Sequence, residues 1–300
     1  MIRSLVLRRH PERAPWKKGV RDAPSREHDG EAGPLAFFAS ELRRLREQAG
    51  WSQGRLGQEI AYSVGLISMV ETARRTPSLD FTERCDQALN ADGVLIRIWP
   101  MLAYGALPSR FRPWVDIERQ AHTLRGWHPL LVPGLLQTSD YARTILQADP
   151  EATDERVEEL LTARLERQTL LTNDNSPPLW TVLDQGVLHR DVGGPEVMRD
   201  QLAALLAASE RRRISVQIVP REAGATGGAI AGMEGGFFIA GVEGSLDSVF
   251  VESAAVGQVT DHPRDVAAIC KRYEAIRSVA LPARAGADLI AKVMTRWQQT

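Results

Sequence analysis

The stretch from Ser52 to Pro77 constrains the fold more than any other part of this 300-residue chain. Ser52 and Ser63 each precede a short run with apolar residues at helical spacing, and serine is a preferred residue at the start of a helix. Few residues separate the two runs. The sequence therefore predicts two short helices joined by a tight turn, an arrangement that can place the second helix in the major groove of DNA.

The two predicted helices each have an inner and an outer face. The inner faces carry the apolar residues at helical spacing, namely Leu56, Ile60, Leu66, Ile67 and Val70. The second helix then turns four residues outward: Val64, Gly65, Ser68 and Met69. Gly57 lies between the apolar residues of the first helix, where the missing side chain lets the two helix backbones approach closely.

Nine residues of this stretch follow one pattern: Ser52, Gln53, Leu56, Ser63, Ile67, Ser68, Glu71, Arg75 and Pro77. In this pattern the chain resembles the phage-repressor-like helix-turn-helix of the XRE/Cro type. Two positions depart from the family's usual wording, because Gly57 replaces an alanine and Ala61 replaces the glycine of the turn. That glycine often has a positive φ, so Ala61 in the same conformation costs about 1 kcal/mol.

The resemblance implies that the second helix, about Ser63 to Glu71, is the recognition helix. Val64 and Gly65 occupy positions where long polar side chains are common, so we expect thymine methyl groups and DNA shape to contribute to specificity. Glu71 is expected to pair with Arg74 or Arg75 rather than to face DNA. The predicted DNA-contacting residues are Arg43, Gln53, Arg55, Ser63, Val64, Gly65, Leu66, Ser68, Met69, Arg74 and Arg75.

Charge and length indicate two domains with different partners. Three hundred residues exceed what one small DNA-binding module needs. The net charge is +3 over residues 1–33, +1 over residues 34–110 and −5 over residues 111–300. Positive charge at the amino-terminal end suits contact with phosphates, and the acidic remainder must face something other than DNA. Because the positive excess is modest, we expect a homodimer on a pseudo-palindromic site of double-stranded DNA.

Several classes of protein are excluded by composition. Only two cysteines are present, Cys85 and Cys270, which argues against a disulfide framework and fits a reducing cytoplasm. No apolar run is long enough to span a membrane. The six histidines show no metal-ligand spacing, and we expect neither a metal nor a cofactor.

The amino-terminal third divides into an arm, a helical domain and a linker. Residues 1–33 lack apolar periodicity and predict a disordered basic arm, which is either a DNA-contacting tail or a solvated extension. Residues 34–104 predict an all-α helix-turn-helix domain of five helices. Pro100 limits or kinks the fifth helix, whose apolar residues suggest an interdomain or dimer contact, and residues 105–110 form the linker.

Residues 111–300 predict a mixed α/β domain, so the fold class is α+β overall. A helix from Trp114 to Leu124 and an irregular loop from Gly126 onward precede a helix capped by Thr138 or Ser139. Four strands of a mixed sheet are expected at Leu179–Leu183, Ile214–Val219, Gly236–Ala240 and Ser248–Glu252. The expected longer helices are Asp154–Leu171, Pro195–Ser209, Arg264–Val279 and Pro282–Trp297.

A second resemblance covers this domain. It rests on Pro133-Gly-Leu-Leu-Gln-Thr with Tyr141-Ala-Arg, on Ala163-Arg-Leu-Glu-Arg-Gln, on Val192-Gly-Gly and on Val219-Pro with Ala223-Gly. These segments are similar to the uncharacterised carboxy-terminal domain of actinomycete regulators described as antitoxin-like or WhiJ-like. The family implies developmental or antibiotic-related control of transcription, often with a small partner protein encoded nearby. Gln185 departs from it, since the family usually has glutamate there.

Arg164, Arg167 and Gln168 lie within about one helical turn and could bind an anionic or carbonyl-bearing effector. The alternative is a set of surface pairs with Glu158 and Glu159. Aromatic residues beside the Pro-Gly loop either line the same pocket or act as structural plugs. The full set of candidate ligand- or partner-binding residues is Trp127, Gln137, Tyr141, Arg143, Arg164, Arg167 and Gln168.

Two further features do not indicate catalysis. The glycine-rich segment from Gly224 to Gly232 lacks the Lys-Ser/Thr ending, the dinucleotide spacing and an obvious following helix, so we expect a mobile connection between strands rather than a phosphate-binding loop. His189 and Asp191 are too close in sequence to face each other on a helix, and no nucleophile accompanies them.

The sequence thus predicts a cytoplasmic, non-enzymatic transcription regulator that binds specific DNA and whose carboxy-terminal domain senses a ligand or a small partner protein. The alternative is an antitoxin-like interaction protein that neutralises a partner and binds DNA only for autoregulation. No catalytic residue is assigned.

Overall fold

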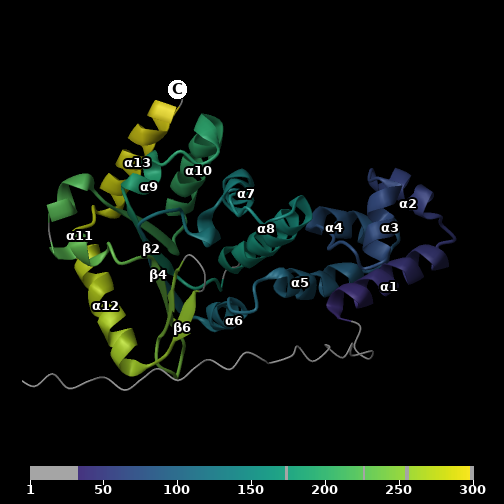
Figure 1. Ribbon diagram of the computed structural model, residues 1–300, viewed down its shortest axis with the longest axis horizontal. Coiled ribbons are helices and arrows are strands. Elements are labelled where there is room, and N and C mark those ends of the chain that lie inside the picture. The colour runs from purple at the N-terminus through teal and green to yellow at the C-terminus, as the bar shows by residue number, and fades with distance from the viewer. Residues whose placement is uncertain (1–32, 173–174, 226, 254–256, 298–300) are drawn as a thin grey trace, which may run out of the picture. The chain divides into compact units, whose positions relative to one another are not determined.

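The structure is a computed structural model that describes residues 33–172, 175–225, 227–253 and 257–297 (Figure 1). The described residues belong to one unit by their backbone contacts. The expected basic arm, residues 1–33, lies outside the described residues except for Gly33.

Five helices open the described chain, as predicted. Their bounds are α1 Pro34–Gln48, α2 Gln53–Ile60, α3 Val64–Glu71, α4 Leu79–Ala88 and α5 Val94–Ala106. They enclose a core whose members include Phe38, Leu42, Leu56, Ile67, Val70, Phe81 and Leu95. Ser52, Ser63 and Ser78 cap α2, α3 and α4 through their side chains, which explains why these helices begin where they do.

The fifth helix differs from the prediction in its length. It continues through Pro100 to Ala106, so the proline does not end it. Its apolar residues Ile98, Trp99 and Leu102 are buried, and the Trp99 indole donates a hydrogen bond to the Pro77 carbonyl at 3.0 Å. The same core cluster includes Ala163 of the carboxy-terminal region. The apolar face of α5 therefore serves as an interdomain contact.

The carboxy-terminal region combines helices with one sheet. The helices are α6 Arg112–Gln120, α7 Ser139–Gln147, α8 Asp154–Gln168, α9 Gly186–His189, α10 Gly194–Ser209, α11 Gly227–Ala231, α12 Pro263–Ser278 and α13 Ala283–Trp297. The strands are β1 Thr123–His128, β2 Leu179–Asp184, β3 Ile214–Val219, β4 Phe237–Gly241, β5 Ser248–Val251 and β6 Gln258–Thr260.

The six strands form a mixed sheet in the order β3-β2-β1-β4-β5-β6. Strands β1, β2 and β3 are parallel, whereas β4, β5 and β6 each run antiparallel to the preceding neighbour in the sheet. In this register Trp127 of β1 lies between Val182 of β2 and Phe237 of β4. The predicted mixed α/β architecture is confirmed.

Strands β1 and β6 were missed by the sequence analysis. Residues 123–128 were assigned partly to a helix and partly to an irregular loop because two glycines and two prolines between Gly126 and Gly134 suggested a break in regular structure. In the structure Gly126 is required within the strand. A β-carbon there would lie 2.4 Å from Nε2 of His128 and 3.1 Å from the Phe238 ring, so only glycine leaves room for these side chains.

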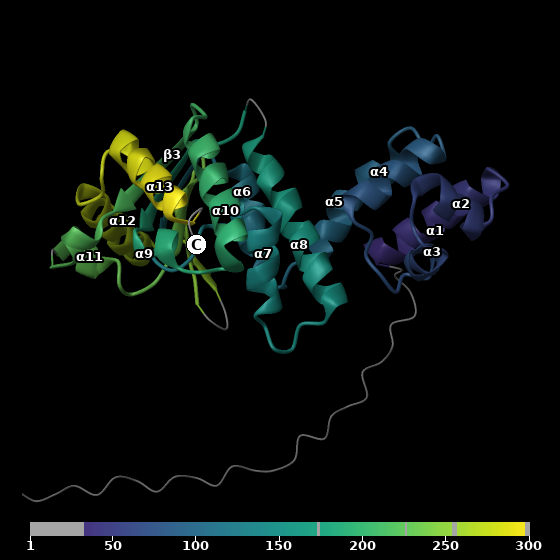
Figure 2. The same ribbon diagram turned by 90° about the horizontal axis from the view of Figure 1, so that it is seen from above.

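Helices cover both faces of the sheet. On one face, α10 and α13 pack side by side (Figures 1 and 2), and their residues Leu202 and Ile290 join a core with Ile218 of β3. On the opposite face, Tyr273 of α12 packs in a separate core with Trp127. The alternation of side chains along each strand supplies both cores.

The glycine-rich segment connects β3 to β4, as expected, and contains helices that the sequence analysis did not predict. A 3₁₀ helix at Arg221–Ala225 is followed by α11, which packs against α12. The Trp127 indole donates a hydrogen bond to the Gly232 carbonyl at 2.8 Å, and a β-carbon at Gly232 would lie 2.6 Å from the Trp127 ring. Glycine at this position is explained by close packing on an aromatic side chain.

Candidate nucleic-acid interface

The turn between α2 and α3 has the predicted geometry. The Ser52 hydroxyl accepts a hydrogen bond from the Arg55 backbone N–H at 3.1 Å, and the Ser63 hydroxyl accepts one from the Leu66 N–H at 3.2 Å. Ala61 ends α2 in the left-handed conformation with φ +58°. The expected positive φ at Ala61 is confirmed, and only three residues separate the two helices.

Gly57 allows the two helices to approach each other. A β-carbon at this position would lie 2.7 Å from the Tyr62 backbone oxygen and 3.3 Å from the Ile67 side chain. The first of these contacts is with backbone, which cannot rotate away as a flexible side chain can. The predicted role of Gly57 is therefore confirmed, and any larger residue must displace the turn.

The outer face of α3 carries the residues that the sequence analysis placed there. Val64 is 48% exposed, Met69 is 38% exposed and Gly65 is exposed, while Ser68 is partly buried. Ile67 and Val70 are fully buried, and Leu66 packs partly against the same core. The segment is helical and its small side chains face outward, as a recognition helix requires.

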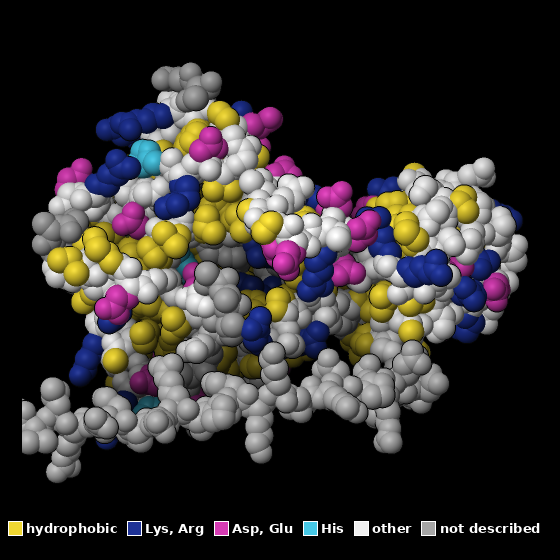
Figure 3. Space-filling view, in the orientation of Figure 1, with side chains coloured by type: hydrophobic (Ala, Val, Ile, Leu, Met, Phe, Trp, Pro, Cys, Tyr) yellow, Lys and Arg dark blue, Asp and Glu magenta, His cyan; other side chains and the backbone are white. Residues whose placement is uncertain are grey.

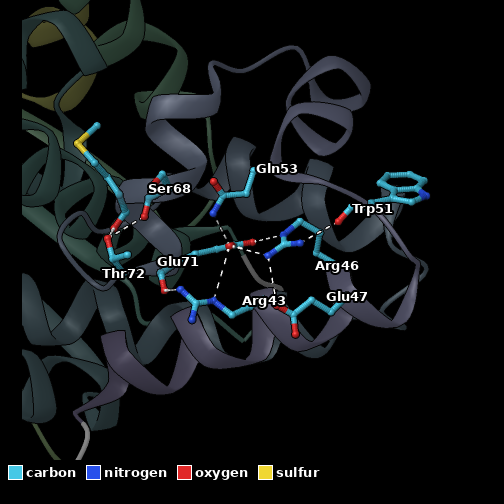
Figure 4. Close-up of polar contacts among 9 residues, drawn as sticks. Arg43, Arg46, Glu47, Trp51, Gln53, Ser68, Glu71 and Thr72 are labelled. Carbon is cyan, nitrogen blue, oxygen red and sulfur yellow. Dashed lines mark hydrogen bonds and ion pairs between the residues drawn. The ribbon is translucent and has the colours of Figure 1, made fainter.

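The carboxy-terminal end of α3 is held in place by the buried carboxylate of Glu71 (Figure 4). Glu71 has a fully buried side chain that accepts hydrogen bonds from Arg46 Nε at 2.6 Å and from Arg46 Nη2 at 2.9 Å. The Gln53 amide donates a third hydrogen bond to it at 2.8 Å. Arg43 Nη2 donates to the Glu71 backbone oxygen at 3.3 Å. Helices α1, α2 and α3 are thus joined through one side chain.

These contacts correct the expected partners of Glu71 and bear on the expected role of Gln53. Glu71 is buried, and its side-chain partners are Arg46, Gln53 and, at 3.8 Å, Arg43 rather than Arg74 or Arg75. The amide nitrogen of Gln53, which is one of the predicted DNA-contacting residues, donates a hydrogen bond to Glu71. Arg46 was missed, although its position four residues after Leu42 and eight after Phe38 places it on the buried face of α1.

The remaining candidate arginines of this domain are at the surface. Arg43, Arg55 and Arg74 are exposed, Arg75 is partly buried, and the Arg55 guanidinium lies 4.7 Å above the Trp51 ring centre. On the face seen in Figure 3, basic and acidic side chains are interspersed over this region. The modest charge excess of the domain is therefore not gathered into one continuous basic patch on that face.

A second group of candidate residues surrounds the Pro-Gly loop between β1 and α7. The Arg164 guanidinium donates a hydrogen bond to Gln137 Oε1 at 2.7 Å, and the Gln137 amide donates one to the Val132 carbonyl at 2.6 Å. The Gln168 amide donates to the Gly134 and Gln137 carbonyls, both at 2.8 Å. Helix α8 therefore fixes the conformation of this loop.

The structure does not bring all the other candidates to the same place. Tyr141 is buried and its hydroxyl accepts a hydrogen bond from the Val132 N–H at 3.3 Å, whereas Trp127 belongs to the core on the opposite face of the sheet. Arg143 pairs with Glu158. Trp127 is thus a buried core residue, which agrees with the structural alternative given for the aromatic residues beside this loop.

Arg164 and Arg167 do not form the surface pairs with Glu158 and Glu159 that were the alternative. Arg167 pairs with Glu118, whose side chain is fully buried, at 2.9 Å. Burial, together with a smaller effect of the neighbouring Arg167, lowers the pKa of Arg164 to about 10, and Glu252 opposes this change. Both guanidiniums line two adjoining cavities of about 330 and 300 Å³.

Histidine and acidic side chains near these cavities have altered proton affinities. Burial, with a further effect of Arg167, lowers the pKa of His128 to about 3, so this imidazole is neutral at physiological pH. Burial raises the pKa of Glu118, an effect that Arg167 and the Trp114 indole oppose. In the described ranges, no group of three or more His, Cys, Asp and Glu side chains is arranged to hold a metal ion.

His189 and Asp191 have different surroundings in the structure. The Asp191 carboxylate accepts a hydrogen bond from the Gly194 N–H at 2.8 Å at the start of α10. His189 lies at the end of the short helix α9, where burial and then the charges of Arg221 and Arg296 lower its pKa. Asp191 therefore has a structural role.

Among the described residues, no helix has both the length and the apolar character needed to cross a membrane.

Comparison with family models matches both regions of the chain. Residues 38–99 match a helix-turn-helix domain, and residues 111–292 match a domain of unknown function, DUF5753. No curated protein and no solved structure matches the chain.

Proposed function

Because the chain belongs to the DUF5753 family and carries an XRE-like helix-turn-helix, a DNA-binding domain of transcription regulators, we propose that it regulates transcription by binding a specific DNA sequence through α3. The observation that carries this proposal is the outward face of α3. Val64, Gly65 and Met69 are exposed there, while the opposite face is anchored in the core. The exposed face is free to meet base edges in a major groove.

The proposed contacts divide into two kinds. Val64, Gly65, Leu66, Ser68 and Met69 contact bases, mainly through apolar contacts with thymine methyl groups. Phosphates are contacted by the amino-terminal ends of α2 and α3 and by four arginines, namely Arg43, Arg55, Arg74 and Arg75. Ser63 caps α3, so its hydroxyl orients the helix rather than reading a base.

We also propose that the protein binds DNA as a homodimer on a pseudo-palindrome. A domain with a net charge of only +1 over residues 34–110 makes few phosphate contacts as a monomer. Two copies double the number of these contacts and of the base contacts, as in other regulators of this type. Analytical ultracentrifugation with DNA of one and two half-sites tests this proposal, and equal affinity for both would contradict it.

The direct test of DNA binding is fluorescence anisotropy with a fragment of the gene's own promoter and a shuffled fragment of the same composition. We expect tighter binding of the promoter and a loss of affinity as salt rises, with a log–log slope of about −0.9 per phosphate contacted. Equal affinity for the two fragments would refute sequence-specific binding.

A matched pair of glycine variants separates the α3 face from general charge effects. A β-carbon at Gly65 meets nothing within 4 Å, and the same is true of Gly105 near the end of α5. Gly65→Glu places a negative charge on the proposed DNA face, so we expect at least a tenfold loss of affinity, which corresponds to about 1.4 kcal/mol. Gly105→Glu should change the affinity less than threefold, and equal losses in both variants would exclude α3 as the reader.

The carboxy-terminal domain is proposed to regulate DNA binding in response to a ligand or a small partner protein. Its support is that α8 contacts both the helix-turn-helix domain and the candidate residues around the Pro-Gly loop. Co-purification of the full-length protein with the product of the neighbouring gene tests the partner. Capture of that product with no effect on DNA affinity would instead favour a neutralising interaction protein.

A further inference from the structure

The larger of the two adjoining cavities has an unusual lining. Six apolar side chains surround it, from the connection between α5 and α6, from α7, from α8 and from β5: Leu107, Pro108, Phe111, Leu146, Leu160 and Phe250. Its other side chains belong to Arg110, Arg164 and Arg167, and none of its described lining residues is acidic. At about 330 Å³ its volume is at the lower end of the range for small-molecule sites.

The two inner arginines of this cavity differ in how their charges are balanced. Arg167 is paired with the buried Glu118 at 2.9 Å. Within the described residues, the Arg164 guanidinium makes its one hydrogen bond to the neutral amide of Gln137 and has no carboxylate within 4 Å. Glu252 of the neighbouring cavity acts on Arg164 only at longer range. The guanidinium of Arg164 therefore lines the cavity as a cation that is not paired with a carboxylate.

The chemistry of Arg164 and of the cavity walls favours a ligand that combines a carboxylate with an apolar group. A guanidinium can donate two parallel hydrogen bonds to one carboxylate, and such bonds are strongest where apolar surroundings exclude water. The apolar walls formed by Phe111, Leu160 and Phe250 suit a hydrocarbon or aryl group attached to that carboxylate. A cationic ligand would be repelled by three arginines.

Helix α8 connects this cavity to the helix-turn-helix domain. Leu160 and Arg164 line the cavity. One turn earlier in the same helix, Arg156 Nη2 donates a hydrogen bond to the Ala106 carbonyl of α5 at 2.8 Å. Glu159 accepts one at 3.1 Å from the hydroxyl of Thr76, which lies five residues after the end of α3. A shift of α8 in response to a ligand would therefore act directly on the DNA-binding domain.

From these observations we infer that the cavity between the α5–α6 connection and α8 binds an amphipathic carboxylate, and that its occupancy alters DNA affinity through α8. Arg164 holds the carboxylate group of this ligand, and the apolar part of the ligand lies against Phe111, Leu160 and Phe250. The second half of this inference rests on the proposed DNA-binding function, whereas the first half does not.

Calorimetric titration of the full-length protein without DNA tests the site. Decanoate is the probe, and decanol is the uncharged probe of equal chain length. We expect saturable binding of one decanoate per chain, with decanol at least tenfold weaker. Arg164→Gln should reduce decanoate affinity at least tenfold and leave decanol affinity unchanged, while the surface control Arg277→Gln should bind both probes as the wild type does.

Three results would overturn the site: no saturable binding of decanoate, equal affinity for the two probes, or unchanged decanoate affinity in Arg164→Gln. Leu146→Trp provides a second, steric variant, because the larger side chain fills the cavity from α7. It should abolish binding of both probes even if the charge variant folds poorly. Retained binding in Leu146→Trp would place decanoate elsewhere and contradict the inference.

Anisotropy with promoter DNA, with and without saturating decanoate, tests the coupling. We expect a change in DNA affinity of about fivefold or more, and the same factor must appear when DNA is added to a decanoate titration. Arg156→Gln should retain decanoate binding and lose the coupling. Unchanged DNA affinity would overturn the coupling, whereas decanoate binding without any specific DNA binding would contradict the proposed function and leave the site intact.

Discussion

The ion pair between Arg46 and Glu71 determines how firmly the proposed recognition helix is held. The Glu71 side chain is fully buried and the Arg46 side chain is 10% exposed, with two hydrogen bonds of 2.6 and 2.9 Å between them. Removing one partner of a buried pair leaves an uncompensated charge and costs about 3–5 kcal/mol. Arg46 keeps a hydrogen bond to the Trp51 carbonyl at 2.8 Å and an ion pair with Glu47 at 3.6 Å, so we expect the lower value, about 3 kcal/mol, for Glu71→Leu.

A double-mutant cycle measures the pair itself. Arg46→Met and Glu71→Leu should each destabilise the domain, whereas the double variant should cost about 2 kcal/mol less than the two losses combined, because no charge is then left buried alone. The measurement is hydrogen exchange of the amides in residues 53–71 across a urea series, which reports on α2 and α3 directly.

An exposed pair provides the control for this cycle. Arg277 and Glu274 are 3.1 Å apart with about half of each side chain exposed, and such pairs contribute about 0.5 kcal/mol or less. Additive losses at Arg46 and Glu71, or coupling no larger than at the exposed pair, would refute the view that this ion pair anchors α3. Glu71→Leu should also weaken promoter binding, although Glu71 does not reach the surface.

Three further experiments test separate features of the fold. Ala61→Gly should raise the free energy of unfolding by about 0.5–1 kcal/mol in urea titrations, since glycine relieves the left-handed conformation, and Ala36→Gly within α1 should lower it by a similar amount. Gly57→Ala should lower it by about 1–3 kcal/mol because the new methyl group meets the Tyr62 carbonyl, and a neutral effect would show that the turn can relax. Between pH 7.5 and 5, urea titrations should show a loss of about 2 kcal/mol from His128, because the unfolded imidazole gains a proton near pH 6.5 while the folded one, with a pKa of about 3, does not. His128→Phe should remove this part of the loss, and an unchanged pH dependence would contradict the low pKa.

Local interactions explain why much of the helix-turn-helix could be predicted from sequence. The Ser52 and Ser63 caps join residues three apart, and the buried faces of α2 and α3 follow from spacings of three and four residues. Ala61 was expected to have a positive φ because of its place in the pattern, and it does. Such features depend on the backbone within one or two turns, so a single sequence determines them.

The tertiary structure decided the features that depend on residues distant in sequence. Glu71 bonds to Arg46 and Gln53, which precede it by 25 and 18 residues, rather than to the nearer arginines. Strand β1 accommodates Gly126 because His128 and Phe238 occupy the space of its missing side chain. The cavity around Arg164 exists only because α7, α8, β5 and the α5–α6 connection meet there. The spacing of residues along the chain specifies which face of a helix is apolar, but the partner of a buried charge depends on which helices and strands pack together.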